Sequence, residues 1–360
     1  MQYFDFLRGE RMYSDQLCAL LGRPPRTPDS EIDQFTSDVA RSLQEVLEDI
    51  LQAKVQYLHA HAPSQNLCMA GGVALNCVAI EKIIRKGPFR RVFVQPASSD
   101  AGACLGAAAI AHVRRTGERP DTAPLRHVSL GPQFSNEEIA ALFRPGSARV
   151  HDYRGRQDEL ISATVDRLVE ARVVGWFQGR MEFGPRALGN RSVLADPRDR
   201  GMRDRINALV KKREAFRPFA PSVLARSAAD HFDLDHPAPF MLETCQVRSP
   251  LELPAITHVD GSARVQTVEA DANPRFSQLL QEFNRRTGCP ILLNTSFNLR
   301  GEPIVCTPVD ALTCFIRSDL DCLVLEDFLL DRAGLPRSWI DRLRSTVPQA
   351  GVVDSVYTLL

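Results

Sequence analysis

The sequence predicts an α/β protein of two domains. In the first third, a short apolar run (NLCMA) leads through Gly71 and Gly72 into the helical pattern VALNCVAIEKIIRKG. The same order then recurs, because RRVFVQP has the pattern of a strand, ASSDAG that of a loop and ACLGAAAIAHVRR that of a helix. Such alternation indicates a layer of mainly parallel strands covered by helices. A length of 360 residues favours two hydrophobic cores.

A long amphipathic helix is predicted before these two units. Apolar residues recur at helical spacing from Ile32 to Leu51, and Ser30 with Asp33 matches a capping box at the helix start. The pattern breaks in HAHAPSQN, so we expect the helix to end between His59 and Pro63. In the later helix ACLGAAAIAHVRR, many small residues would let the backbone pack closely on a neighbour.

Residues 116–135 are rich in Pro, Thr and Gly and are predicted to link the two domains. We place the boundary so that residues 1–125 form the first domain and residues 126–360 the second. The second opens with NEEIAALF, a helix from Asp158 to Ala171 leads into the strand VVGWF, and CPILLNTSFN is predicted as a central strand that feeds a polar loop. We expect the C-terminal segment to pack on this domain through Leu335, Trp339, Ile340 and Leu343.

Charge and composition exclude several classes of protein. The formal net charge is zero, so no global field attracts the chain to nucleic acid or to a membrane surface. No apolar run is long enough to span a bilayer and the N-terminus does not resemble a signal peptide, so we expect a cytoplasmic protein. The nine cysteines lack metal-ligand spacing and are predicted to be buried thiols rather than disulfides.

The stretch GWFQGRMEFGPRALGNRSVLADPRD combines flexible backbone with positive charge. Glycine lets backbone N–H groups approach an anion, and guanidinium groups offer paired donors to phosphate oxygens. The alternative is a solvated loop whose arginines pair with Glu182, Asp196 and Asp199, which is the commoner case for this composition. The interleaved residues are Gly179, Arg180, Gly184, Arg186, Gly189 and Arg191.

Two further segments favour an anion site. In RINALVKKREAFRPFAPSVL a basic cluster precedes an apolar segment, which is unusual for a solvated helix face. In LLNTSFNLRGEPIV, amides and hydroxyls follow a strand, where they are common both at ligand sites and in turns. The residues concerned are Lys211, Lys212, Arg213 and Arg217 in the first segment, and Asn294, Thr295, Ser296 and Asn298 in the second.

Together with GGVALN and SSDAGACLGAA, these segments occur in the order of a known family between Ser30 and Asp331. The chain resembles the ATP-dependent O-carbamoyltransferases of antibiotic and nodulation-factor biosynthesis. The resemblance implies the C-terminal half of an ASKHA-like (ribonuclease H-like) domain followed by a YrdC-like α/β domain. It also implies that the chain begins partway into the first domain, and that a protein partner or self-association covers the incomplete half.

The same resemblance implies a reaction and a set of residues. Carbamoyl phosphate and ATP with Mg²⁺ would give carbamoyl adenylate in the YrdC-like part. The carbamoyl group would then pass to a hydroxyl of a natural product in the ASKHA-like part, aided by Fe²⁺ or another divalent metal. The implied catalytic residues are Arg180, Lys211, Arg217, Asn294 and Ser296, and the substrates would also contact Glu182, Arg186, Arg191, Arg213, Arg264 and Asn298. The implied nucleotide loop has Gly71, Gly72 and Asn76, and Asp100 is the implied metal ligand.

The metal site departs from the family pattern. The family's H-x-x-x-H pair and second aspartate are absent, and the close pair His59 and His61 would point to different faces of a helix. Asp100 also has a simpler interpretation as the N-cap of the helix that follows. The transfer step of this chain alone is therefore in doubt.

Several functions stay open at this point. The chain is an O-carbamoyltransferase or its larger subunit, a transferase to another acceptor that needs no metal in the first domain, or a truncated non-catalytic or regulatory homologue. A start codon assigned too late would also explain the short first domain. The sequence does not predict the acceptor, the metal or the oligomeric state.

Overall fold

The computed structural model describes residues 2–4, 11–27, 30–120, 125–143, 149–211 and 216–338. They fall into two compact units, one up to Pro63 and one from Ser64 onward. In the first unit, α1 (Asp15–Leu21) precedes the long helix α2 (Gln34–His61). Oδ1 of Asp33 accepts the N–H of Thr36 at 2.8 Å, so Asp33 caps α2 and the predicted cap at Ser30 is wrong. The predicted end of this helix is confirmed.

The second unit opens with the predicted strand–helix–strand arrangement. Strands β1 (Asn66–Met69) and β2 (Arg91–Val94) pair in parallel, as expected. The short turn η1 (Gly72–Leu75) and helix α3 (Cys77–Lys86) connect them. Helix α3 buries Ala79, Ile80 and Ile83, which lie on one face at helical spacing.

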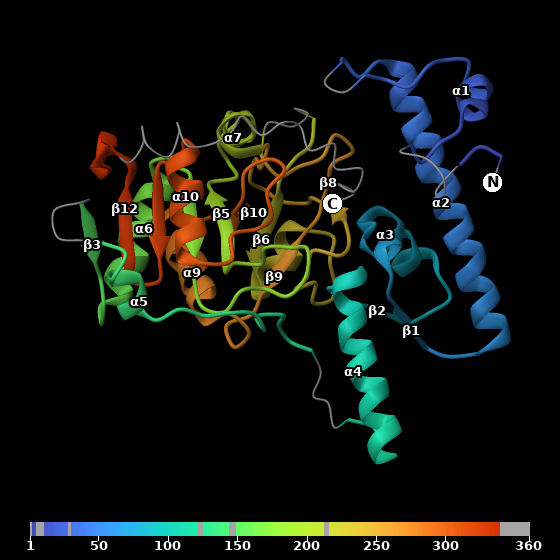
Figure 1. Ribbon diagram of the computed structural model, residues 1–360, viewed down its shortest axis with the longest axis horizontal. Helices are drawn as coiled ribbons and strands as arrows, with labels where there is room; N and C mark the ends of the chain where they lie inside the picture. Colours follow the sequence, from blue (N-terminus) through green and yellow to red (C-terminus); the bar gives the residue numbers. More distant parts are fainter. Residues whose placement is uncertain are drawn as a thin grey trace. The chain divides into compact units, whose positions relative to one another are not determined.

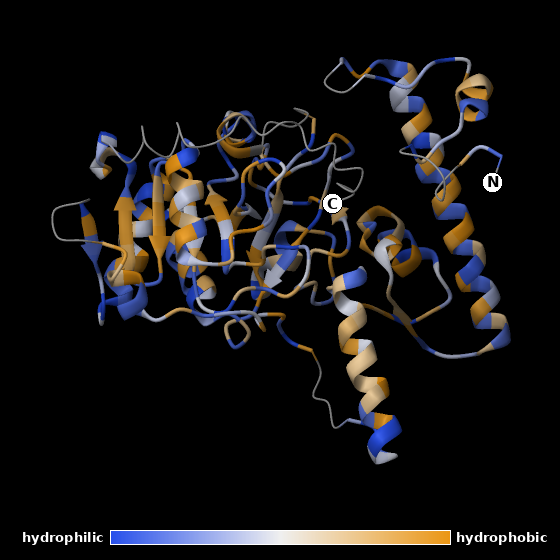
Figure 2. Ribbon diagram, in the orientation of Figure 1, coloured by the Kyte–Doolittle hydropathy of each residue, from blue (hydrophilic) through white to orange (hydrophobic). Residues whose placement is uncertain are grey.

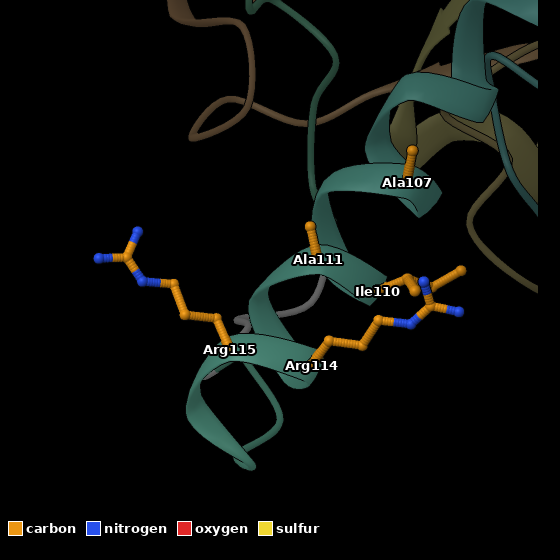
Figure 3. A pocket seen from close by; sticks show the side chains of 5 residues that line it. All are labelled: Ala107, Ile110, Ala111, Arg114 and Arg115. Atoms are coloured by element: carbon orange, nitrogen blue, oxygen red, sulfur yellow. The ribbon is translucent and has the colours of Figure 1, made fainter.

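Helix α4 (Asp100–Thr116) differs from the expectation. Its ribbon is largely hydrophobic (Figure 2), yet none of its residues is buried. The prediction that its small residues pack closely on a neighbour is therefore wrong for the part of the chain that the structure describes. A shallow hollow runs along its C-terminal half, where Ala107, Ile110 and Ala111 lie beside Arg114 and Arg115 (Figure 3). One helix supplies all of this lining.

The rest of the second unit is built on a mixed eight-stranded sheet in the order β3-β12-β11-β4-β5-β10-β6-β9 (Figure 1). Two neighbouring pairs, β11 with β4 and β6 with β9, are parallel, and the others are antiparallel. The strands are β3 (Val150–Asp152), β4 (Val174–Phe177), β5 (Arg191–Ala195), β6 (Ala220–Leu224), β9 (Gln266–Val268), β10 (Ile291–Ser296), β11 (Cys322–Leu325) and β12 (Phe328–Asp331).

Helices cover both faces of this sheet, with α10 in front and α6 and α9 behind (Figure 1). The strands predicted in VVGWF and CPILLNTSFN and the helix predicted from Asp158 are confirmed as β4, β10 and α6. The helices are α5 (Asn136–Ala140), α6 (Gln157–Val169), α7 (Met202–Ile206), α8 (Ala228–His231), α9 (Pro274–Thr287) and α10 (Pro308–Arg317); the short elements are η2 (Asn207–Lys211), η3 (Ala225–Ser227), η4 (Arg332–Gly334), β7 (Cys245–Gln246) and β8 (Ser262–Ala263).

The hydrophobic core lies between the sheet and these helices. Trp176 of β4, Phe276 and Phe283 of α9 and Phe315 of α10 are fully buried, and each contributes roughly 1.5–3 kcal/mol of burial free energy. Leu335 belongs to this core as expected. The other residues predicted to anchor the C-terminal segment, Trp339, Ile340 and Leu343, lie outside the described residues.

All nine cysteines are free thiols, as predicted, but they are not uniformly buried. Cys245, Cys289, Cys314 and Cys322 are buried, whereas Cys68 and Cys104 are exposed and contradict the prediction. They lie on β1 and α4, which bury few side chains. Among the described helices, none is both long and apolar enough to cross a membrane.

Candidate anion-binding site

The loop between β4 and β5, which we call the arginine loop, carries Arg180 and Arg186 of the predicted basic residues. Arg191, the first residue of β5, lies buried at the base of this loop. The Arg191 guanidinium donates to the carbonyls of Gln178 at 2.8 Å and Gly179 at 3.1 Å. It also lies 3.5 Å over the ring of Phe177. Burial lowers the pKa of Arg191 to about 10. Both Nη groups of Arg191 are used by backbone carbonyls of the loop, while its Nε is buried with no hydrogen-bond partner, so the structure gives Arg191 a mainly structural position.

Glu182 holds the other side of the loop. Its Oε1 accepts the N–H of Leu188 at 2.6 Å and the N–H of Asn190 at 2.8 Å. Burial raises the pKa of this carboxyl, although the two N–H groups oppose the shift. The alternative in which Glu182 forms a surface ion pair is wrong, since only 5% of the residue is exposed and its Oε1 accepts backbone N–H groups.

Two glycines let the loop approach its neighbours. Gly189 has φ +107°, and a Cβ built there would lie 2.3 Å from Cδ1 of Phe276 in α9. Gly184 has φ +132°, and a Cβ there would lie 3.2 Å from the carbonyl oxygen of Pro96. No other residue type fits this combination of φ and space without strain. The segment that follows β2 therefore lies against the arginine loop.

Three arginines from separate segments lie close together in the fold. Arg186 is in the loop, Arg217 precedes β6, and Arg264 lies between β8 and β9. Burial lowers the pKa of Arg186 to about 10, and the charges of Arg264 and Arg217 lower it further. Burial likewise lowers the pKa of Arg264, with Arg217 adding to the shift and Cys77, the first residue of α3, opposing it. We call Arg186, Arg217 and Arg264 the arginine cluster.

Two of the three members of the arginine cluster have no neutralising carboxylate among the described residues. Among the described residues, neither Arg186 nor Arg264 forms an ion pair, and Nε of Arg186 is buried with no hydrogen-bond partner. Like charges held together in partly buried positions repel one another and favour an anionic ligand. The cluster therefore has the charge and the donors for phosphate groups.

The predicted polar strand end lies on β10. Asn294 is 1% exposed, and its Nδ2 donates to Oγ of Ser222 at 3.0 Å and to Oε1 of Gln266 at 3.2 Å. Its Oδ1 is buried with no partner. Further along, Oγ of Ser296 donates to Oδ1 of Asn298 at 2.7 Å. Asn294 thus has an unused acceptor, which a buried amide rarely leaves unsatisfied.

Other predicted substrate-binding residues lie elsewhere or are not described. Arg180 is exposed and donates to the carbonyl of Leu130 at 3.4 Å, and it is not part of the arginine cluster. The side chain of Lys211, and all of Lys212 and Arg213, lie outside the described residues. The structure therefore brings together Arg186, Arg217 and Arg264 from the predicted set but does not place the lysines.

The residues predicted for a nucleotide loop and a metal lie in the first part of the second unit. Gly71, with φ +95°, and Gly72 are exposed in the turn before α3, which Asn76 caps by accepting the N–H of Ala79 at 3.1 Å. Asp100 is exposed and is the first residue of α4, so the N-cap is Ser99 and the predicted capping role of Asp100 is wrong. The described part of the chain holds no group of three or more metal-ligating side chains. Asp100 alone does not fit a metal site.

Sequence reasoning missed the residues that hold the loop from outside. Oε1 of Glu326 accepts the N–H of Gly179 at 2.5 Å, and Arg275 bridges Glu326 at 3.2 Å and Oε1 of Gln178 at 2.5 Å. Gln266 and Ser222 were missed as well. A non-glycine φ of +46° at Glu326 marks a tight turn in the structure, but no motif in the sequence indicated it.

Comparison with known proteins defines the class. Residues 1–109 match the family description "Carbamoyltransferase N-terminus" and residues 165–332 match "Carbamoyltransferase C-terminus". The chain belongs to the carbamoyltransferase family. The predicted boundary between residues 125 and 126 stays a prediction.

Three individual relatives are similar to most of this chain. The chain is 41% identical to nodulation protein NolO of Bradyrhizobium diazoefficiens over 98% of this chain and 66% of that protein. It is 39% identical to the 3'-hydroxymethylcephem-O-carbamoyltransferase of Amycolatopsis lactamdurans over 72% of this chain and 47% of that enzyme. An uncharacterized Synechocystis protein, sll1178, is 44% identical over 94% of this chain and 59% of its own length. The chain thus spans from about half to two thirds of these relatives.

A solved structure of full-length HypF aligns with 52% of this chain and 23% of that one, with 16% identity and a TM-score of 0.35. This similarity is too weak to define the fold.

Proposed function

We propose that this chain carries the carbamoyl-activating part of an O-carbamoyltransferase, where carbamoyl phosphate and ATP with Mg²⁺ yield carbamoyl adenylate. The observation that carries the proposal is the arginine cluster of Arg186, Arg217 and Arg264, which lies on the same sheet domain as the unused acceptor of Asn294. Both substrates are polyanions, and one ends in an amide. The arginine cluster matches the phosphate groups, and the unused acceptor of Asn294 matches the amide.

The charge of the cluster suits phosphoryl chemistry. A guanidinium with a pKa of about 10, as at Arg186, is still protonated near neutral pH, so burial weakens but does not remove its charge. Such groups hold phosphate oxygens in the ground state and stabilise the charge that develops on a departing phosphate. Fixed donors in a partly dry site also position the reacting groups without later reorganisation.

The atoms of the proposed first step balance with one water. Water cleaves carbamoyl phosphate to carbamate and inorganic phosphate. A carbamate oxygen then attacks the α-phosphorus of ATP, an α–β phosphoanhydride bond breaks, and pyrophosphate leaves. The cluster would hold the leaving phosphate groups, and Asn294 would accept an N–H of the carbamoyl amide. Ser296 and Asn298 lie further along the same strand and loop and would contact its oxygens.

The second step, transfer to an acceptor, needs more than the described residues supply. We propose that the acceptor is a hydroxyl of a natural product, and that a protein partner or a second copy covers the unburied surface of α4. A divalent metal such as Fe²⁺ at Asp100 would require ligands from that partner, so we derive no step through it. Use of ATP and carbamoyl phosphate also fits a reaction in the cytoplasm.

Pyrophosphate release tests the proposed first step. The chain is incubated with ATP, Mg²⁺ and carbamoyl phosphate, pyrophosphate is measured over time, and the adenylate is identified by mass spectrometry. We expect release that depends on carbamoyl phosphate, and a decrease of about 100-fold in Arg264→Met because one charge-stabilising group is lost.

Arg200→Met is the matched control. Arg200 is exposed, pairs with Glu252 at 2.5 Å and lies outside the cluster, so its removal should leave the rate unchanged. A folded wild-type chain that releases no pyrophosphate in response to carbamoyl phosphate would contradict the proposal and favour a non-catalytic homologue.

A further inference from the structure

Gln266 connects three parts of the candidate site through one buried side chain. It lies on the edge strand β9 and is 4% exposed. Its Nε2 donates to the carbonyl of Leu188 in the arginine loop at 2.8 Å. Its Oε1 accepts the hydroxyl of Ser222 at 2.6 Å and Nδ2 of Asn294 at 3.2 Å. The network therefore joins β9, β6, β10 and the loop.

The donor and acceptor directions in this network follow from one group, the Leu188 carbonyl, which can only accept a hydrogen bond. A backbone carbonyl only accepts, so Gln266 must turn its NH₂ group toward Leu188 and its oxygen toward Asn294. Facing an acceptor, Asn294 must in turn present its own NH₂ group. The oxygen of Asn294 is then directed away from the network, where it is buried and has no partner.

We infer that Gln266 is a specificity-determining positioning residue, which orients Asn294 so that only an acceptor is available to the substrate. This inference rests on the proposed function. An acceptor at this position selects a ligand with an N–H donor, such as a carbamoyl group. An acetyl group has a methyl in the same place and would leave the buried oxygen of Asn294 unsatisfied, which is costly.

The hydrogen bond to Leu188 also joins the two segments that carry Arg186 and Arg264. Arg186 precedes Leu188 by two residues in the loop, and Arg264 precedes Gln266 by two residues in the approach to β9. Glu182 fixes the same peptide from the other side, because its carboxylate accepts the N–H of Leu188 at 2.6 Å. Both guanidinium groups are thus attached to segments that Gln266 holds together.

Selectivity between two acyl phosphates tests the inference. Carbamoyl phosphate and acetyl phosphate have the same phosphate and nearly the same shape, so contacts with the cluster cancel in the ratio of their affinities. Each is titrated into the chain by calorimetry. We expect the wild-type chain to prefer carbamoyl phosphate by at least about tenfold, the contribution of one buried hydrogen bond.

The informative variant is Gln266→Met, which keeps the side-chain length but has no amide. The hydroxyl of Ser222 then has no acceptor on residue 266 and can donate to Oδ1 of Asn294, so the Asn294 amide is free to turn. We expect the preference to fall to about threefold or less, which corresponds to roughly half of the binding free energy of one such hydrogen bond. A Gln266→Met chain that is folded and keeps the full preference overturns the inference.

A control variant separates orientation from general loss of stability. Thr267→Val removes a buried acceptor of the Ala238 N–H from the next residue of the same strand, on the opposite face, and should lower stability without changing the preference. Loss of the preference in Thr267→Val would overturn the assignment to Gln266.

If Gln266→Met does not fold, Gln266→Glu is used. Its carboxylate still accepts from Asn294 but cannot donate to Leu188, so we expect weaker binding of both ligands with the preference retained, and loss of the preference overturns the inference. A wild-type chain that binds both ligands equally also overturns it, while the anion site of the proposed function stands. A wild-type chain that binds neither overturns both proposals.

Discussion

The ring of Phe276 fills the space that a side chain at Gly189 would occupy. A Cβ at Gly189 would lie 2.3 Å from Cδ1 of Phe276, and the backbone there has φ +107°. We predict that Gly189→Ala destabilises the protein by about 2–4 kcal/mol, from backbone strain together with overpacking. Urea unfolding of the variant measures this cost.

A double variant separates the two contributions. Phe276→Ala opens the space above residue 189, so Gly189→Ala should cost less in that background than in the wild-type chain. Equal costs in both backgrounds would show that the ring of Phe276 does not limit residue 189.

Glu182→Gln tests the buried carboxyl that holds the loop. Burial raises the pKa of Glu182, so the folded state binds this proton more tightly than the unfolded chain does. The stability from that proton is complete below the unfolded pKa of about 4.3 and is lost as pH rises through the higher folded pKa. We therefore expect Glu182→Gln, which does not titrate, to gain stability relative to wild type as pH rises across this window.

Glu182→Ala is the companion variant at a single pH. It removes the acceptor of the Leu188 and Asn190 N–H groups and should cost about 2–4 kcal/mol in unfolding experiments. A loss below ~0.5 kcal/mol would mean that these N–H groups find water instead.

His236 gives a second pH dependence, in which the protonated form carries a positive charge. The hydrogen bond that Nε2 of His236 donates to the Glu243 carboxylate raises the pKa of His236 to about 9, with Asp235 adding to the effect. The stability from the protonated ring is complete below the unfolded pKa of about 6.5 and is lost as pH rises through about 9. Partial exposure of the ring screens the effect, so we expect only about 1 kcal/mol.

His236→Gln should remove this dependence. Its unfolding free energy should vary less than that of wild type between pH 6.5 and pH 9, measured in urea at matched ionic strength. An unchanged slope would show that another group titrates there.

The sequence predicted those elements whose patterns are local. The two strand–helix units of the first third, β4, β10 and α6 follow from apolar runs between glycine- or proline-containing breaks. Strands β5, β6, β9, β11 and β12 were not predicted. β9 has only three residues, and β6 contains Pro221, which is uncommon inside a strand. Their mixed order depends on long-range pairing, which no local pattern encodes.

The candidate site divides in the same way. Residue type and spacing singled out Arg186 and Arg217, and the family resemblance added Arg264, which the fold brings together with them. No local pattern distinguished Arg191 from the arginines of the cluster. Its guanidinium donates to backbone carbonyls, because strand β5 begins inside the core. The sequence did not indicate the roles of Gln266 and Ser222. The hydrogen-bond partners of a polar residue in a three- or five-residue strand are known only when the neighbouring strands are known.

Arg186→Met tests whether the arginine cluster binds an anion. Like charges that repel one another without a ligand destabilise the fold, so removing one of them should raise the unfolding free energy by about 1 kcal/mol in phosphate-free buffer. Pyrophosphate should raise the melting temperature of the wild-type chain, because it binds the folded state alone, and should have much less effect on Arg186→Met. Arg200→Met, in which an exposed ion pair is lost, should respond to pyrophosphate as wild type does. If Arg186→Met loses stability in phosphate-free buffer and keeps the full response to pyrophosphate, Arg186 is a structural residue and the anion is held elsewhere.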